Sequence, residues 1–256
     1  MKNITQSFIK DVFKYNEEKL CGLQIKAKYY DNISFPSSDV QLLGQWFEYK
    51  ATGQKNRFGI IPEPPKLKSG LYPKKYNDIL THVEPLKKTI ENLGYEIIET
   101  GTRIKEKGLQ GDVDLVLKHV ETGKIAFGDI KTTGLINDKW NEYGWDEESL
   151  QFKHNLLLQP IHYKLLGLFK YGYEPDFFFF IFSNTNQVDR KTYKINLADG
   201  RFEEHLQHVE KVYEIKNKAE INGWKAIPNV KECHNCPLKS TCKSFIDIPK
   251  IVDIYY

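Results

Sequence analysis

The spacing of apolar residues in the first hundred positions predicts helices. Apolar residues recur every three or four positions over 4–15, which is the stripe of a helix with one buried face. A second helix is predicted over 39–51, with Ser37 and Ser38 available as N-caps and Gly53 after its end. A third is predicted over 76–93, where Pro85 should kink or divide it. Residues 21–35 form a looser stretch with no clear period.

After position 95 the pattern changes to that of strands. Short apolar or alternating runs separated by turn residues predict strands, and longer amphipathic runs predict helices between and after them. The predicted strands are 96–99, 112–117, 125–131, 176–183 and 191–197, and the predicted helices are 150–171 and 201–224. The run 176–183 is nearly all apolar, as in a strand buried on both faces. This order favours an α/β fold with a central mixed β-sheet flanked by helices.

Composition narrows the class of protein. The chain has 256 residues, of which 40% are hydrophobic and 28% charged, as in a soluble globular protein. No stretch approaches the roughly 18 apolar residues of a membrane helix, and the first residues lack the apolar run of a signal peptide, so we expect a cytoplasmic protein without a membrane partner. The net charge of +3 excludes a histone-like polycation but permits a local basic groove.

Acidic residues stand in two of the predicted strands. An antiparallel hairpin that turns at Glu121 and Thr122 would pair Asp114 with Asp129, and Lys131 would lie one step along the same face. Opposed carboxylates destabilise a sheet unless a cation lies between them, and oxygen ligands suit Mg²⁺ or Mn²⁺. Such a site can hydrolyse phosphodiesters. The alternative is a solvated strand face with an ordinary ion pair, although Asp is unusual in strands.

Two helices carry further candidates. Glu48 ends the run Gly44-Gln45-Trp46-Phe47-Glu48, where it is either an exposed helix residue or a carboxylate aimed at the metal. Gln159 and Tyr163 are four positions apart and therefore share a helix face, where Tyr163 could also be a core residue. Pro160 interrupts this helix or restarts it.

Three of the four cysteines, Cys233, Cys236 and Cys242, lie within ten residues, and Cys21 stands alone. In a reducing compartment, clustered thiols favour metal ligation over disulfides. Four thiolates suit either a zinc ion or a 4Fe–4S cluster.

Together these motifs resemble the PD-(D/E)xK nuclease superfamily, in particular its RecB-like branch with an iron–sulfur cluster, which includes nucleases of CRISPR adaptation and of AddB type. The resemblance extends from Cys21 to Cys242 and implies a restriction-endonuclease-like core. It also implies a single domain over 1–256, with a helical region 1–95, a catalytic core 96–200 and a Cys-rich region 225–256.

The resemblance assigns a role to each candidate residue. It implies metal ligation by Asp114, Asp129, the Ile130 carbonyl and Glu48, with Lys131 assisting the attacking water. It places Gln159 and Tyr163 beside the active site, in contact with DNA or with the lysine. It favours the 4Fe–4S cluster over zinc for Cys21, Cys233, Cys236 and Cys242.

We therefore expect a metal-dependent deoxyribonuclease, an exonuclease on single-stranded DNA or DNA ends. Because no G-x4-G-K-[ST] motif occurs, unwinding would need a helicase or recombination partner. One alternative is a non-catalytic DNA-binding or assembly module. Another is an endonuclease of the same fold, either RNA-directed or with a zinc site in place of the iron–sulfur cluster. Two groups are candidates for DNA contact. The first is the basic-aromatic patch at Lys66, Lys68, Tyr72, Lys74, Lys75, Tyr76, Lys87 and Lys88, which could equally be a solvated lysine-rich face. The second is the loop residues Trp140, Tyr143 and Trp145, which could equally form a packed lid.

Overall fold

The computed structural model describes residues 3–33, 35, 37–55, 59–227, 233 and 236–244. The chain divides into two compact units. The first contains Met1–Gln6 and Ser37–His205, and the second contains Ser7–Pro36 and Leu206–Tyr256. Each is described by itself. None of the described helices is long and apolar enough to cross a bilayer.

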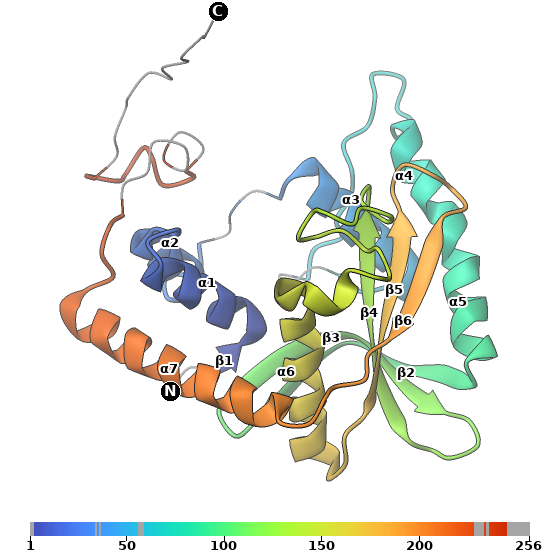
Figure 1. Ribbon diagram of the computed structural model, residues 1–256. Coiled ribbons are helices and arrows are strands. Elements are labelled where there is room, and N and C mark those ends of the chain that lie inside the picture. The colour runs from blue at the N-terminus through green and yellow to red at the C-terminus, as the bar shows by residue number, and fades with distance from the viewer. Residues whose placement is uncertain are drawn as a thin grey trace, which may run out of the picture. The chain divides into compact units, whose positions relative to one another are not determined.

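The first unit is built on a mixed sheet, which within the described residues has six strands in the order β1-β3-β4-β5-β6, with β2 also paired to β3 (Figure 1). β3 runs antiparallel to β2 and β4, and β4 runs parallel to β5. The strands are β1 Ile4–Thr5, β2 Tyr95–Glu106, β3 Leu109–His119, β4 Ile125–Thr133, β5 Asp176–Ser183 and β6 Arg190–Lys194. The predicted α/β class with a mixed sheet is confirmed.

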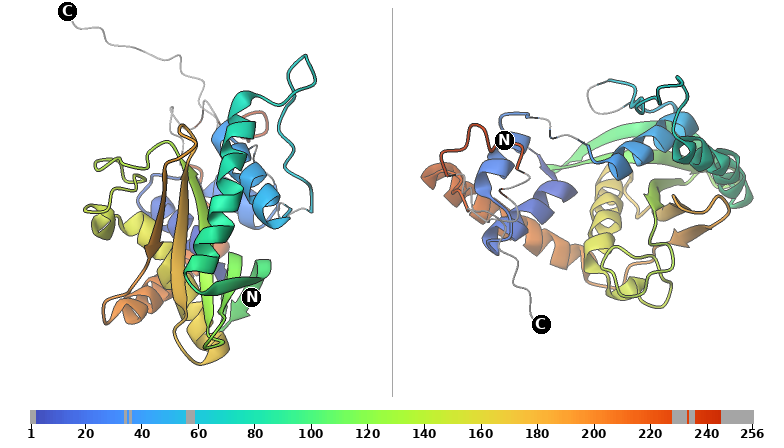
Figure 2. Two further views of the ribbon diagram at one scale, coloured as in Figure 1. Left: turned by 90° about the vertical axis from the view of Figure 1, so that its right-hand side faces the viewer. Right: turned by 90° about the horizontal axis from the view of Figure 1, so that it is seen from above.

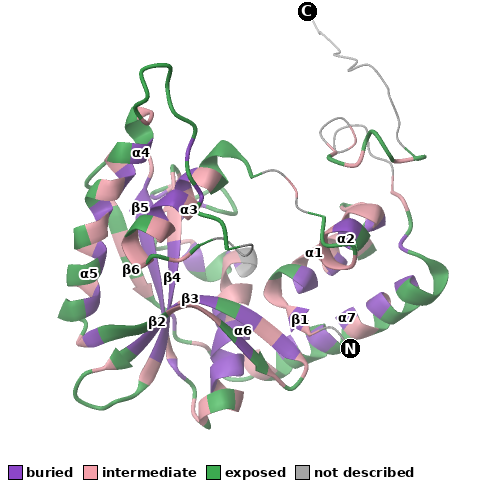
Figure 3. Cartoon of the chain, turned by 180° about the vertical axis from the view of Figure 1, so that it is seen from behind, coloured by how far each residue is buried: buried purple, intermediate pink, exposed green. Residues whose placement is uncertain are grey.

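β5 explains how both faces of the sheet are filled. Its side chains alternate between faces, and nearly all of them are buried (Figure 3). Phe178, Phe180 and Phe182 belong to the apolar core of one face. On the other face, the Phe177 ring lies 6.1 Å from that of Tyr163. The continuous apolar run is therefore a strand with a core on each side.

Helices cover the two faces (Figure 2). On one side lie α3 Asp39–Thr52, α4 Lys74–Asp78, a 3-10 turn Ile79–His82 and α5 Val83–Asn92. On the other lies α6 His154–Tyr171, which follows a short 3-10 turn Leu150–Phe152.

The predicted helix ends on the first of these faces are confirmed. Ser38 and Gln41 form a capping box that starts α3, and Gly53 ends it in the left-handed conformation at φ 76°. The predicted division of 76–93 occurs at the 3-10 turn, so Pro85 falls in the first turn of α5, where a missing N–H is not needed.

The second unit contains most of α1 Gln6–Asn16, α2 Gly22–Tyr29 and most of α7 Arg201–Asn222. The looser stretch expected at 21–35 is wrong over 22–29, which is helical. Distant contacts stabilise α2: Gly22 donates its N–H to Lys225 O at 3.0 Å, and a Cβ at Gly22 would lie 2.5 Å from that oxygen. The predicted helix 4–15 also begins later, because Ile4 and Thr5 pair with β3.

Candidate active site and cysteine cluster

The β3–β4 hairpin has the register that the sequence predicts. Leu115 pairs with Gly128 and Lys118 with Ile125, so the next position along places Asp114 opposite Asp129. The carboxylate of Asp114 accepts the N–H of Ile130 at 2.9 Å. The two aspartates thus lie side by side where the paired segment ends.

α3 adds a third carboxyl group. A Cβ at Gly44 would lie 3.0 Å from Thr132 Oγ1, so the glycine lets α3 approach β4 closely. Glu48 follows one turn later and shares a hydrogen bond with the carboxyl group of Asp114. The G-x-x-x-E spacing therefore delivers Glu48 to the hairpin.

Asp129 is the most enclosed residue of the cluster, with 1% of its side chain exposed. Lys131 forms an ion pair with Asp129, and the side-chain amide of Gln159 donates to Asp129 Oδ1. The ion pair with Lys131 is made by Asp129 Oδ2, which is buried. Lys131 keeps a third of its side chain exposed, so the cluster opens to solvent at the lysine.

Burial dominates the electrostatics of this cluster. It raises the pKa of Asp114 to about 8, helped by the negative charge of Glu48, and it raises the pKa of Asp129 to about 7. Burial likewise raises the pKa of Glu48. Burial alone would lower the pKa of Lys131, but the charges of Asp129 and Asp114 outweigh it and raise that pKa. One lysine thus does not balance the negative charge that the three carboxyl groups would have if all were ionised.

Tyr163 lies next to the cluster, and its contacts are with β3. Its hydroxyl donates to Asp112 O at 2.8 Å, and its ring fills the space above Gly111, where a Cβ would lie 2.5 Å from ring carbon. The side chain is buried, and burial raises its pKa well above the ordinary value. The hydroxyl contacts β3, not the lysine, and it is not presented to solvent.

The donor set suits a hard divalent cation. Glu48, Asp114, Asp129 and the carbonyl of Ile130 offer oxygen atoms, which Mg²⁺ and Mn²⁺ prefer. As the side chains stand, no group of three or more His, Cys, Asp or Glu residues in the described part of the chain is arranged to hold a metal ion. In this cluster the oxygens contact Lys131, Gln159 and one another instead.

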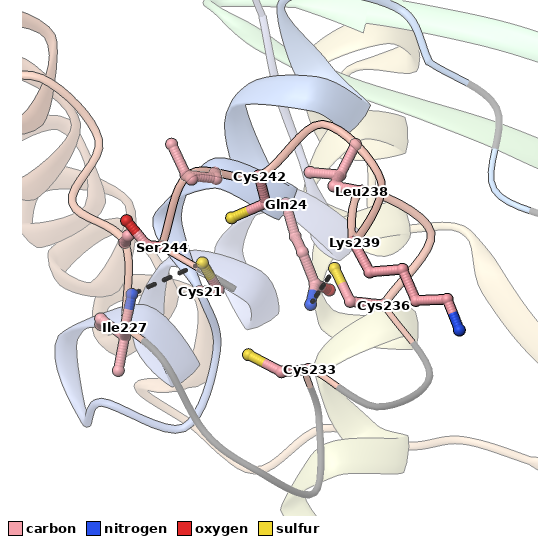
Figure 4. A pocket seen from close by; sticks show the side chains of 11 residues that line it. Cys21, Gln24, Ile227, Cys233, Cys236, Leu238, Lys239, Cys242 and Ser244 are labelled. Carbon is pink, nitrogen blue, oxygen red and sulfur yellow. Dashed lines mark hydrogen bonds between the residues drawn. The ribbon is translucent and has the colours of Figure 1, made fainter. Parts of the chain in front are cut away.

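The cysteines gather in the second unit. Cys21, Cys233, Cys236 and Cys242 line one hollow, and their sulfur atoms lie around it (Figure 4). Cys21 Sγ accepts the N–H of Ile227 at 3.5 Å. Burial raises the pKa of Cys236, and the other three thiols raise it further. All four are free thiols. The structure thus brings the lone Cys21 to the other three, as predicted.

Other predicted contact residues are placed differently. Trp145 is buried, with its ring 5.0 Å from that of Phe179, so it belongs to a packed loop. Tyr76 is fully buried and bonds Asp39, which removes it from the basic-aromatic patch. Pro160 lies inside α6, and the helix neither ends nor restarts there. Gln159, the residue before it, contacts Asp129.

Sequence reasoning did not identify Thr132 as the residue against which Gly44 packs. Only the alternation of Ile130 and Thr132 toward the α3 face hints at it. It also left His162 undecided between a packed, an exposed and a cleft-facing residue. His162 is buried, with Nδ1 2.9 Å from His205 Nε2.

No protein-family model matches the chain, and no curated protein matches it. Among solved structures, the chain resembles a protein from Eubacterium rectale named "Putative exonuclease", with a TM-score of 0.56 and 15% identity over 85% of this chain and 82% of that one. The two chains share a fold. A second structure, SSO0001, has a TM-score of 0.33 at 14% identity over 88% of this chain and 95% of that one, too low to bear on the fold.

Proposed function

We propose that this protein is a metal-dependent nuclease that hydrolyses phosphodiester bonds in DNA, as an exonuclease on single strands or ends. The observation that carries the proposal is the convergence of Glu48, Asp114, Asp129 and Lys131 from α3, β3 and β4, with Gln159 from α6. A structural ion pair needs one carboxylate for one lysine. Three carboxyl groups with raised pKa values, Asp129 buried and the other two half-buried, instead indicate a site prepared for added positive charge.

Glu48, Asp114, Asp129 and the Ile130 carbonyl would hold the cation. When bound, a divalent ion polarises a phosphoryl oxygen and lowers the pKa of its water. Lys131, with a third of its side chain exposed, would hold the attacking water by a hydrogen bond and stabilise negative charge that develops on the phosphate. Gln159 holds Asp129 Oδ1 and thereby fixes the orientation of that carboxylate.

The likeness to the Eubacterium rectale protein supports this proposal through the fold and through that protein's name. The iron–sulfur cluster is part of the same proposal, and its support is the four thiols around one hollow. The cluster would be structural, because the hollow is built from α2 and the C-terminal segment of the second unit.

The test is cleavage of end-labelled single-stranded and duplex DNA by anaerobically purified protein, with Mg²⁺, with Mn²⁺ and with a chelator. We expect mono- or oligonucleotide products from single strands or ends only when a divalent cation is present. Equal cleavage in chelator, or no cleavage of any substrate, would contradict the proposal. Binding of DNA without cleavage would instead support a non-catalytic DNA-binding module.

A further inference from the structure

The loop between β4 and α6 presents large apolar side chains to solvent. Trp140 is 90% exposed and Phe152 is 72% exposed, and both line one hollow in this loop. Large aromatic side chains contribute most to stability when buried, so an indole left almost wholly in water adds little to this fold. Packing does not explain the position of Trp140, because so little of its side chain is buried.

The backbone that carries Trp140 is firmly built. Asp138 Oδ1 accepts the N–H groups of Trp140 at 2.9 Å and Asn141 at 2.8 Å. The buried Lys153 donates to the carbonyls of Asp138 at 3.0 Å and Gly144 at 2.8 Å, which ties the two ends of the turn together. The exposure of the indole is therefore a consequence of a defined turn, not of a loop without internal contacts.

Trp145 anchors the same loop to the sheet. Its side chain is buried. Its backbone N–H donates to Leu135 O at 3.0 Å, and its backbone carbonyl accepts a hydrogen bond from the hydroxyl of Tyr193 at 2.8 Å. Of the two tryptophans in the loop, one thus fixes the loop and the other is held out from it.

The charged side chains around the hollow are balanced. It is lined by Glu142, Glu148, Lys139 and Lys153, and Lys139 pairs with Glu148 at 2.8 Å. The ammonium group of Lys153 donates to two backbone carbonyls of the loop. Because both lysines are engaged within the loop, the hollow offers a ligand chiefly its two exposed aromatic side chains, which can stack on a base.

The loop also starts and ends at the candidate active site. It leaves β4 shortly after Asp129 and Lys131, and it leads into α6, which carries Gln159. We propose that Trp140 and Phe152 form a stacking site for an unpaired base of a single-stranded substrate, whose phosphates lie toward Lys131. The proposal rests on the proposed nuclease function and specifies its substrate as single-stranded.

Tryptophan fluorescence tests this directly. Of the four tryptophans only Trp140 is exposed, since Trp46, Trp145 and Trp224 are all buried. In the presence of a chelator, a single-stranded oligodeoxyadenylate should quench Trp140 and shield it from acrylamide, whereas a blunt duplex hairpin should not. Trp140→Ala should weaken binding of the single strand at least about fivefold, the lower end of the effect of one base–aromatic stack.

Two variants serve as controls. Trp140→Phe should restore part of the affinity. Val120→Ala, at an exposed apolar residue in the β3–β4 turn, should bind as the unaltered protein does. Unchanged affinity in Trp140→Ala, equal shielding by the hairpin, or no quenching at all would overturn the proposal. Cleavage with Mn²⁺, measured in parallel, distinguishes failure of the proposed nuclease function from failure of the proposed stacking site. Failure to cleave contradicts the nuclease function, and unchanged binding with intact cleavage contradicts only the stacking site.

Discussion

Among single residues, Asp114 and Asp129 have the carboxyl groups whose protonation links the proposed metal site to stability. Both pKa values are raised mainly by burial, to about 8 and about 7, so the folded protein without metal retains protons that the unfolded chain releases near pH 4. Because the folded state binds more protons between about pH 4 and 8, the free energy of unfolding must fall as pH rises through this range.

We therefore expect the melting temperature of the chelator-treated protein to fall between pH 5 and pH 8, by about 2–4 °C for each kcal/mol lost. Mn²⁺ should restore stability most at pH 8, where the carboxylates are ionised. Asp129→Asn should flatten the pH profile. Calorimetry in matched buffers measures this, and a profile that rises with pH in chelator would show that one lysine does balance the negative charge of the cluster.

Tyr163 gives a second prediction at this scale. Tyr163→Phe removes the hydrogen bond to Asp112 O, which costs about 1 kcal/mol and about 2–4 °C in melting temperature. Because Asp112 lies two residues from Asp114, cleavage should also slow at saturating substrate. Tyr95→Phe is the control, since it loses a tyrosine hydrogen bond of similar length, 2.9 Å to Asp176 Oδ2, outside the cluster and the loop. Equal rates in the two variants would reduce Tyr163 to a packing residue.

At the scale of elements, α3 positions Glu48 through the contact between Gly44 and Thr132. Gly44→Ala gains roughly 1 kcal/mol of helix propensity but presses a methyl group on Thr132 Oγ1. We expect little change in melting temperature and a higher cation concentration for half-maximal cleavage, because Glu48 is displaced. Adding Thr132→Ala should restore the cation dependence. If the double variant is no better than Gly44→Ala alone, the close approach of α3 does not position Glu48.

The elements also show what sequence can and cannot predict. Short-range sequence signals predicted the features that depend on neighbouring residues. Ser38 and Gly53 mark the start and end of α3, and the hairpin turn sets the register that places Asp114 opposite Asp129. They failed at α2, whose apolar pattern is weak and whose packing on Lys225 depends on residues 200 positions away. Likewise, the sequence does not determine whether the hydroxyl of Tyr163 faces the active site or the sheet, because that depends on the space that Gly111 leaves for the ring.

At the scale of the whole molecule, the two units have separate chemistry: the carboxylates lie in the first, and the thiols lie in the second. We expect anaerobically purified protein to be brown and to contain iron, and Cys21→Ser to lose that iron together with stability, since ligand binding energy is folding energy in such sites. Lys243→Ser, an exposed change in the same segment, is the control. Elemental analysis that finds one zinc per chain and no iron would replace the cluster with a zinc site.

The carboxylate cluster is proposed to cleave phosphodiesters with a divalent cation, and single-turnover cleavage of a labelled single-stranded oligonucleotide in Mn²⁺ measures that reaction. The protein, Asp129→Asn and the control Asp176→Asn, an aspartate on β5 bonded to Tyr95 and Lys194, should be compared. We predict that Asp129→Asn lowers the rate at least about 100-fold, a loss of about 3 kcal/mol of transition-state stabilisation. Asp176→Asn should cleave at nearly the unaltered rate. Cleavage by Asp129→Asn at the rate of the unaltered protein would contradict the account.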